Sequence, residues 1–174
     1  MSNTIKYESM DEGDVRFYLK DANIIQYRSL VGYTMQKLLP RNKSYVIILY
    51  PVSSETQGHW VVITRFNRTF EYFDSYGGKP DDPFSWPTSN FKWYPHYLSS
   101  MFRRTKMKVL YNTIPFQTKK DLNVSTCGAY VVFRVLTMLE MNASMQKNNQ
   151  MLEHLHKTTG QSYDDIVVNY INKR

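Results

Sequence analysis

The sequence predicts an α+β domain in which a central mixed sheet packs against a buried helix, with further helices at both ends of the chain. Short β-branched and aromatic runs, which are typical of strands, gather between Tyr45 and Tyr111. The stretch Cys127–Met141 is almost entirely apolar and too long for a strand, which favours a buried helix. With 174 residues, of which 42% are hydrophobic, one domain spanning residues 1–174 is expected.

The first half of the chain predicts helices followed by strands. Residues Asp14–Leu39 carry apolar side chains at loosely helical spacing and end at Pro40, so we expect one or two short helices there. Three strands are expected next, at Tyr45–Tyr50, His59–Phe66 and Thr69–Asp74. Asn67 and Arg68 have the composition of a turn, so the last two strands form a hairpin.

The second half of the chain predicts a loop, one more strand and then helices. Three prolines between Lys79 and Trp93 indicate a surface loop. A short helix is expected at Pro95–Arg104 and a fourth strand at Lys106–Tyr111. After the long apolar helix, two further helices are expected near Ser144–Lys157 and Ser162–Asn172.

Composition limits the setting and the partners of the chain. A lone cysteine cannot form an intrachain disulfide, which fits a reducing compartment. No apolar run approaches the roughly 20 residues that span a bilayer, and Met1–Met10 has no signal-peptide pattern. The net charge of +7 permits non-specific DNA binding, with basic clusters at Arg103–Lys108 and Lys119–Lys120. The alternative is an ordinary solvated basic surface.

Cys127 stands at the first turn of the expected long helix, which is a favourable position for a nucleophile. The partial positive charge of a helix N-terminus stabilises a thiolate, and the backbone N–H groups there can hold an oxyanion. Gly128 follows and lets a substrate backbone approach. The alternative is a structural cysteine in the core, which is a common place for this residue type.

A catalytic thiol needs a base, and His59 is the best placed of four histidines. It opens a strand, from whose end its side chain can reach a neighbouring helix terminus. His154 and His156 are two residues apart on a helix and face different ways, and His96 lies at a loop-to-helix junction among aromatic residues. A strand-end histidine is otherwise usually structural.

Two polar residues can complete such a site. Asp74 ends the strand that pairs with the His59 strand, so its carboxylate can orient the imidazole. Alternatively, Asp74 simply starts a turn; Glu71, on the same strand but nearer the hairpin turn, is the weaker candidate for the acid. Gln117 follows a strand and precedes the long helix, where its amide can donate to an oxyanion.

Four segments together resemble the adenain and ubiquitin-like-protein protease superfamily of cysteine proteases. They are Gly58-His59-Trp60, Tyr72–Gly77, Pro115-Phe116-Gln117 and Ser125–Tyr130. Their order along the chain is His, Asp, Gln, Cys, whereas papain-like enzymes run Gln, Cys, His, Asn. The resemblance covers about Tyr45 to Met141 and is closest to viral maturation proteases of adenoviruses, large DNA viruses and virophages.

The resemblance implies a papain-like core in permuted chain order and a role for each matching residue. His59 would be the base, Asp74 its orienting acid, Cys127 the nucleophile and Gln117 the oxyanion donor. On the substrate-binding side it implies Trp60 as a wall and Gly128 as the point of close approach. The segment between Gln117 and Cys127 is longer than the usual spacing, which makes the match of Gln117 the weakest.

The implied activity is that of a cysteine endopeptidase that cuts after small, Gly-type residues and matures viral capsid or core precursors. No metal or required cofactor is expected, although adenain implies activation by DNA or a peptide. The expected protein is a monomer without membrane attachment, acting in host cytoplasm or nucleus and in the virion. Two alternatives stay open: a deSUMOylase or deubiquitinase-like isopeptidase, and a non-catalytic basic protein that binds nucleic acid or capsid.

Overall fold

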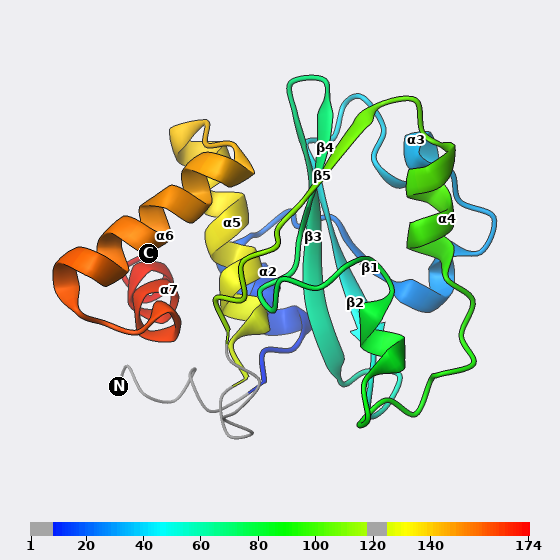
Figure 1. Cartoon of the computed structure of the whole chain (residues 1–174), viewed down its shortest axis with the longest axis horizontal. Coiled ribbons are helices and arrows are strands. Elements are labelled where there is room, and N and C mark those ends of the chain that lie inside the picture. Colours follow the sequence, from blue (N-terminus) through cyan, green and yellow to red (C-terminus); the bar gives the residue numbers. More distant parts are fainter. Residues whose placement is uncertain (1–8, 118–124) are drawn as a thin grey trace.

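The computed structural model of the chain describes residues 9–117 and 125–174, and its centre is a five-stranded sheet (Figure 1). The strands, in their order across the sheet, are β1 (Ile24–Gln26), β2 (Tyr45–Pro51), β3 (Gly58–Phe66), β4 (Thr69–Phe73) and β5 (Lys108–Tyr111). β3 is antiparallel to β2 and β4, while β1 pairs parallel with β2 and β5 parallel with β4. The predicted α+β class with a central mixed sheet is therefore confirmed.

The hairpin of β3 and β4 forms where the sequence predicts it. Phe66 pairs with Thr69 across the turn, and Asn67 adopts a φ of 56°, in the left-handed region that asparagine tolerates better than most residues. Pairing continues from the turn back to Val62 and Phe73. Both strands therefore run from the turn toward the same end of the sheet.

Strand β1 is absent from the sequence prediction, which expected only helices in Asp14–Leu39. The structure has one short helix, α2 (Glu12–Tyr18), then β1, the 3₁₀ turn η1 (Tyr27–Leu30) and α3 (Met35–Leu38). The strand is three residues long and half-buried throughout, so it carries no alternation of apolar and polar residues. It exists because its backbone pairs with β2.

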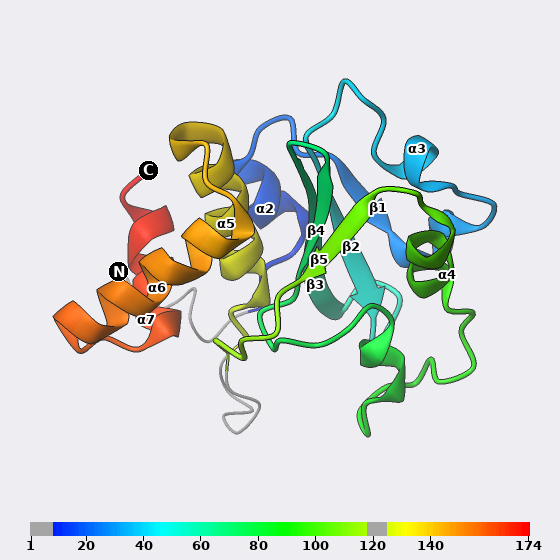
Figure 2. The ribbon, with the colours of Figure 1, turned by 45° about the horizontal axis from the view of Figure 1, so that its top comes forward.

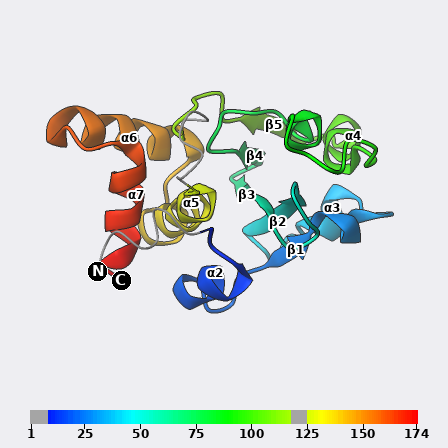
Figure 3. The ribbon, with the colours of Figure 1, turned by 90° about the horizontal axis from the view of Figure 1, so that it is seen from below.

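Helices cover both faces of the sheet (Figures 1 and 3). One apolar cluster joins β3 to α2, α5 (Cys127–Met141), α6 (Met145–Thr159) and α7 (Tyr163–Asn172). On the other face, a second cluster packs η1, α3, the 3₁₀ turn η2 (Asp82–Ser85) and α4 (Tyr97–Arg104) against β2, β3 and β4. The sheet is thus enclosed on both sides, which explains the continuous apolar runs of β2 and β3.

Helix α5 is the helix closest to the sheet, and its bounds match the prediction. It packs on β3 and is flanked by α2 and α7 (Figure 2). Twelve of its fifteen residues are buried, as the apolar sequence requires. The buried guanidinium of Arg134 bonds to Glu71 of β4 at 2.6 Å and to the carbonyl of Ala143 at 3.0 Å. This pair joins α5 to the sheet and to the start of α6.

Some of the predictions concern residues that the structure does not describe, and others are not tested by it. The basic pair Lys119–Lys120 and residues 1–8 lie outside the described residues. Over residues 9–117 and 125–174, no helix has the length and apolar character that crossing a bilayer requires. The expectation of one domain over the whole chain stays a prediction.

Candidate active site

Three segments that are separate in sequence lie near one another where α5 packs on the sheet: the start of β3, the end of β4 and the start of α5 (Figure 1). His59 lies near the start of β3, Asp74 directly follows β4, and Cys127 is the first residue of α5. The hairpin turn lies at the far end of β3 and β4, so the strand ends beside α5 come together through pairing alone. The sheet and the buried helix therefore bring three of the predicted site residues into one place.

His59 and Asp74 form a buried pair. The Nε2 atom of His59 lies 2.8 Å from Oδ1 of Asp74. The backbone N–H of Tyr76 donates to the same oxygen, also at 2.8 Å, so the carboxylate is held from two sides. His59 is 2% exposed and Asp74 is fully buried. An enclosed carboxylate of this kind fixes the ring orientation and stabilises an imidazolium.

Cys127 completes a line of three groups. Cys127 lies within interaction range of the imidazole of His59, whose Nε2 is bonded to Asp74. Burial alone would lower the pKa of His59. The charge and hydrogen bond of Asp74, and then the bond and charge of Cys127, outweigh burial and raise that pKa to about 10. The raised pKa favours the protonated imidazolium form of His59, next to the Cys127 side chain.

The start of α5 is anchored by a residue from the far C-terminal helix. Cys127 is the first residue of α5, so its backbone N–H has no intrahelical partner and is available to an oxyanion. Thr126 occupies the N-cap position but makes no side-chain cap. Instead, its buried hydroxyl donates to the carboxylate of Asp164 in the first turn of α7. Helix α7 thereby holds the residue that precedes the nucleophile.

Gln117 lies beside the segment that follows β4. Its backbone N–H donates to the carbonyl of Ser75 at 2.9 Å, and its Oε1 accepts from the Ser75 hydroxyl at 2.8 Å. The preceding residue, Phe116, is buried and stacks with Tyr130 of α5 at a centroid distance of 6.4 Å. Gln117 thus joins the neighbourhood of Asp74, and its assignment as an oxyanion donor stays a prediction.

Two aromatic rings enclose the imidazole. The ring of Tyr76 stacks on His59 at 5.1 Å with an interplanar angle of 29°, and Trp86 lies at 5.0 Å with an angle of 58°. Both rings are partly exposed. Burial and the nearby charges of Cys127, Asp74 and Asp164 raise the pKa of Tyr76, so its hydroxyl stays protonated. These rings exclude water and favour a cationic imidazole over a neutral one.

Trp60 and Gly128, the two predicted substrate-binding residues, meet at Met10. The indole N–H of Trp60 donates to the carbonyl of Met10 at 2.8 Å, and Trp60 is 2% exposed. A β-carbon on Gly128 would lie 2.8 Å from Cβ of Met10, so glycine is needed here for packing. Their contact with substrate stays a prediction, since the contacts that the structure shows for both are internal.

Glu71, the weaker candidate for the acid, is engaged elsewhere in the fold. Glu71 is bound to Arg134 and also accepts from the backbone N–H of Met145 at 2.9 Å, so it braces α5 and α6. In the described part of the chain, no group of three or more His, Cys, Asp or Glu side chains is arranged to hold a metal ion.

Several residues of the site were missed by the sequence reasoning. They are Met10, Ser75, Tyr76, Trp86, Asn112 and Asp164. Ser75 and Tyr76 directly follow Asp74 and lie in the segment Tyr72–Gly77 that carries the resemblance, but the sequence analysis gave neither residue a role in the site. Asn112 is buried; its Nδ2 donates to the carbonyl of Asp74 at 2.6 Å and to that of Ile114 at 3.0 Å. In the sequence, the only sign of a role for Asn112 is that it is a polar residue directly after a predicted strand.

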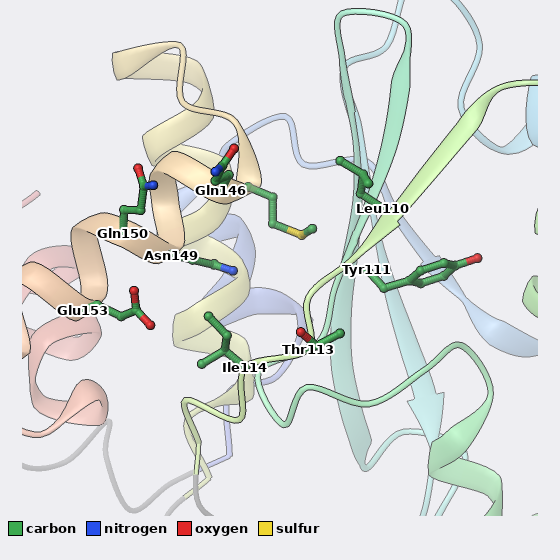
Figure 4. A pocket seen from close by; sticks show the side chains of 9 residues that line it. Leu110, Tyr111, Thr113, Ile114, Gln146, Asn149, Gln150 and Glu153 are labelled. Atoms are coloured by element: carbon green, nitrogen blue, oxygen red, sulfur yellow. The ribbon is translucent and has the colours of Figure 1, made fainter.

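A pocket lies behind Asn112, between β5 and α6 (Figure 4). Leu110, Ile114 and Asn149 are among its lining residues. The amide of Asn149 donates to Oδ1 of Asn112 at 3.0 Å. One wall of the pocket is therefore two hydrogen bonds away from the backbone of Asp74.

Comparison with solved structures finds two proteases. The ASFV pS273R protease matches with a TM-score of 0.46 and 17% identity over 85% of this chain and 61% of that one. The SUMO protease Ulp1, with its catalytic cysteine oxidized to a sulfinic acid, matches with a TM-score of 0.40 and 13% identity, over 94% of this chain and 79% of that one. These likenesses are remote, and membership of the adenain and ubiquitin-like-protein protease superfamily stays a prediction.

Comparison of sequences finds a relative in a virophage. No protein-family model matches the chain. The uncharacterized protein V9 of Sputnik virophage is 31% identical over 122 residues, which are 66% of this chain and 67% of V9. At that identity, over two thirds of the relative, the chain belongs to the same family as V9 of Sputnik virophage.

Proposed function

We propose that this chain is a cysteine endopeptidase that cuts peptide bonds after small residues. The observation that carries the proposal is the buried line Cys127–His59–Asp74, in which the imidazole contacts both the thiol and the carboxylate. A structural cysteine in an apolar core needs neither partner. A thiol on the first turn of a helix, together with an imidazole and a carboxylate, supplies the parts of a thiol hydrolase.

The first half of the reaction acylates the enzyme. The Cys127 thiolate attacks the scissile carbonyl, a C–S bond forms, and the carbonyl electron pair moves to oxygen. The backbone N–H of Cys127 and the amide of Gln117 donate to this oxyanion. As the intermediate collapses, the C–N bond breaks and the His59 imidazolium gives its proton to the leaving amine.

The second half returns the thiol. Neutral His59 takes a proton from water, and the resulting hydroxide adds to the thioester carbonyl. The C–S bond then breaks, the carboxylic acid leaves, and the proton on His59 restores the ion pair with Cys127. Asp74 stays ionised throughout and stabilises the imidazolium whenever it forms.

The small exposed fraction of the site residues supports a preference for cleavage after a small residue. Cys127 is 5% exposed and His59 is 2% exposed. Tyr76 and Trp86 stand against the imidazole, and Met10 packs beside the nucleophile on Gly128. A carbonyl carried by glycine can approach such a thiol, whereas a branched side chain would collide with these neighbours.

The proposed substrates are viral structural precursor proteins. Support comes from the viral origin of the relative, V9 of Sputnik virophage. The exposed basic side chains of Arg103, Arg104, Lys106 and Lys108 would allow the enzyme to associate with packaged DNA. On that proposal, DNA binding weakens steeply with added salt and ignores sequence.

The proposal is tested by thiol labelling followed by cleavage. Iodoacetamide at pH 6, with mass spectrometry to read the label, is expected to modify Cys127 much faster than the free thiol of N-acetylcysteine. Virophage capsid precursors are expected to be cut by the wild type and left intact by Cys127→Ala. Labelling no faster than the free thiol would refute the activated nucleophile, whatever the substrate.

The cleavage assay also separates an endopeptidase from an isopeptidase. Lysine-linked ubiquitin and SUMO conjugates are incubated beside the precursors at equal concentration. Cleavage of the conjugates alone would replace the endopeptidase proposal with the isopeptidase one. The active-site chemistry would be the same in both cases, so Cys127→Ala serves as the control for each.

A further inference from the structure

We propose that Asn112 is a positioning residue for catalysis: its side-chain amide holds the turn at residues 74–77 in the shape that directs the Asp74 carboxylate at His59. The inference rests on the proposed function, because it requires His59 and Asp74 to act on Cys127. Asn112 directly follows β5 and is 1% exposed. It acts on the imidazole through Asp74, and its basis is a set of buried hydrogen bonds between two segments of the chain.

The turn at residues 74–77 determines where the carboxylate lies. The Gly77 N–H donates to the Asp74 carbonyl at 2.9 Å, and the Tyr76 N–H donates to Oδ1 of Asp74 at 2.8 Å. The same Oδ1 lies 2.8 Å from Nε2 of His59. An aspartate side chain is short, so the backbone that carries it decides which groups the carboxylate can reach. A shift of this turn would therefore separate the carboxylate from the imidazole.

Asn112 bonds to this turn from the segment that follows β5. Its backbone N–H donates to the Tyr72 carbonyl at 2.9 Å, which continues the pairing of β4 with β5. Its Nδ2 donates to the Asp74 carbonyl at 2.6 Å. That carbonyl thus accepts from two donors, Gly77 and Asn112, which occupy both of its lone pairs. Because the Asn112 amide is buried, water does not compete for these bonds.

The orientation of the Asn112 amide follows from its backbone partners, because each of them can act in only one way. Nδ2 faces the carbonyls of Asp74 and Ile114, which only accept. Oδ1 accepts from the Ile114 N–H at 3.1 Å, and this group only donates. A flipped amide would set its oxygen against two carbonyl oxygens and its N–H groups against another N–H. The donor end of Asn112 is therefore the end that faces the turn.

The two segments also fit closely against each other. Gly77 adopts a φ of 70°, and a β-carbon on it would lie 2.9 Å from the carbonyl oxygen of Thr113 and 3.0 Å from the carbonyl carbon of Ile114. Asn112 is itself held from α6, because the amide of Asn149 donates to its Oδ1 at 3.0 Å. The sheet edge and α6 thus hold Asn112, and Asn112 holds the turn that carries the carboxylate.

A serine at this position separates the bond to the turn from the local fold of the segment. Serine, like asparagine, can accept from the backbone N–H two residues ahead, so Asn112→Ser keeps the contact with Ile114. Its hydroxyl is one bond shorter than the amide and does not reach the Asp74 carbonyl. Asn112→Ala loses both contacts. The pair of variants therefore isolates the bond between Asn112 and Asp74.

The readout is the pKa of His59, which a general loss of stability does not change in a folded chain. Burial lowers this pKa, and the charge of Asp74 outweighs burial and raises it to about 10, so a displaced carboxylate lowers it again. Cys127 and Tyr76 are the other titratable side chains that the described structure places against the ring, and both are retained. Proton NMR of the Cε1–H group, assigned with His59→Gln, follows the titration in the full chain.

Asn112→Ser and Asn112→Ala are expected to lower the pKa of His59 by about one unit or more, the size of shift that a neighbouring charge produces. In the Asp74→Asn background neither substitution should lower it further, because no carboxylate is left to direct. Thr64→Val is the matched control. It removes a buried hydroxyl of β3 that makes two hydrogen bonds of 3.2 Å, so Tm should fall while the pKa of His59 stays at the wild-type value.

An unchanged pKa of His59 in both Asn112 variants, an equal drop in Thr64→Val, or a further drop in the Asp74→Asn background would overturn the inference. If Asn112→Ala does not fold, Asn112→Ser decides alone, and its own failure to fold would show a purely structural role. Failure of the proposed function has a different signature. His59 of the wild type would then titrate near the ordinary histidine pKa of 6.5, and Cys127 would react with iodoacetamide no faster than N-acetylcysteine.

Discussion

His59 and Asp74 meet diagonally across two neighbouring strands. The β3–β4 register, extended by one residue past Phe73, places Asp74 opposite Val61, two positions from His59. Diagonal partners on one face of a sheet lie about 7–8 Å apart at Cα, so two extended side chains can bridge them. The observed separation between Nε2 and Oδ1 is 2.8 Å. The pair is thus a product of strand register, and slippage by one residue would abolish it.

Replacing Asp74 with asparagine should change both the rate and its pH dependence. The Asp74 charge is the main influence that raises the pKa of His59 to about 10. Without it, His59 loses its proton at lower pH, so the alkaline limb of the pH–alkylation profile should move toward neutrality. We expect kcat to fall by about two orders of magnitude or more, as when a triad loses its orienting acid. An exposed aspartate, changed in Asp21→Asn, provides the control, and an unmoved alkaline limb would contradict the assignment.

The pH dependence of stability should carry the signature of the same proton. The folded chain holds the His59 proton up to about pH 10, while the unfolded chain loses it near the ordinary histidine pKa of 6.5. This contribution to stability is complete below about pH 6.5 and declines as the pH rises to 10. We expect Tm, measured by circular dichroism, to fall over this window in the wild type and to fall less in His59→Gln. His154→Gln, on exposed α6 surface, should behave like the wild type.

Gly58 should tolerate no side chain. A β-carbon there would lie 1.6 Å from the carbonyl oxygen of Tyr50, which is backbone and cannot move without breaking the β2–β3 pairing. We expect Gly58→Ala to lower the free energy of unfolding by about 4 kcal/mol or more, in the range of severe backbone effects. Gly13→Ala in α2 meets only a side-chain oxygen of Asp11, at 3.1 Å, and should change it by less than about 1 kcal/mol. Urea unfolding of both variants measures the difference, and equal midpoints would refute the argument.

Asp164 should influence the nucleophile through Thr126. In Asp164→Ala the buried Thr126 hydroxyl loses its acceptor, which costs about 1–3 kcal/mol of stability and loosens the start of α5. We expect slower acylation of Cys127 together with a lower Tm. Asp165→Ala is the control, because the carboxylate of Asp165 accepts from Ser162 at 2.7 Å within α7 itself. If Asp165→Ala slowed acylation and lowered Tm more than Asp164→Ala does, α7 would not support the nucleophile through Asp164.

Much of this fold is predictable because its longer strands are continuous β-branched and aromatic runs and its long helix is almost entirely apolar. The bounds of α5 follow from an apolar run that no strand could accommodate, and the hairpin follows from Asn67 between two β-branched runs. The sequence also predicts Cys127, His59 and Asp74 as site residues, because each lies at or next to the end of a helix or strand, where side chains can converge.

What could not be predicted depends on contacts between distant segments. Strand β1 is defined by its pairing with β2 rather than by its own three residues. Because β3 is covered on both faces, its sequence does not reveal which of its side chains point to which core, and the contact of Trp60 with Met10 could not be predicted. Ser75 and Asp164 are ordinary polar residues until their partners, 42 and 38 positions away along the chain, are known.

The order of the site residues along the chain has a consequence for biosynthesis. The contact of His59 with Asp74 spans only 15 residues, so the base and its acid can assemble within one hairpin while the ribosome is still at work. The thiol is translated later and becomes reactive only when α5 docks on β3. We therefore expect a nascent chain to have no hydrolytic activity until its last third has emerged, which protects neighbouring polypeptides during synthesis.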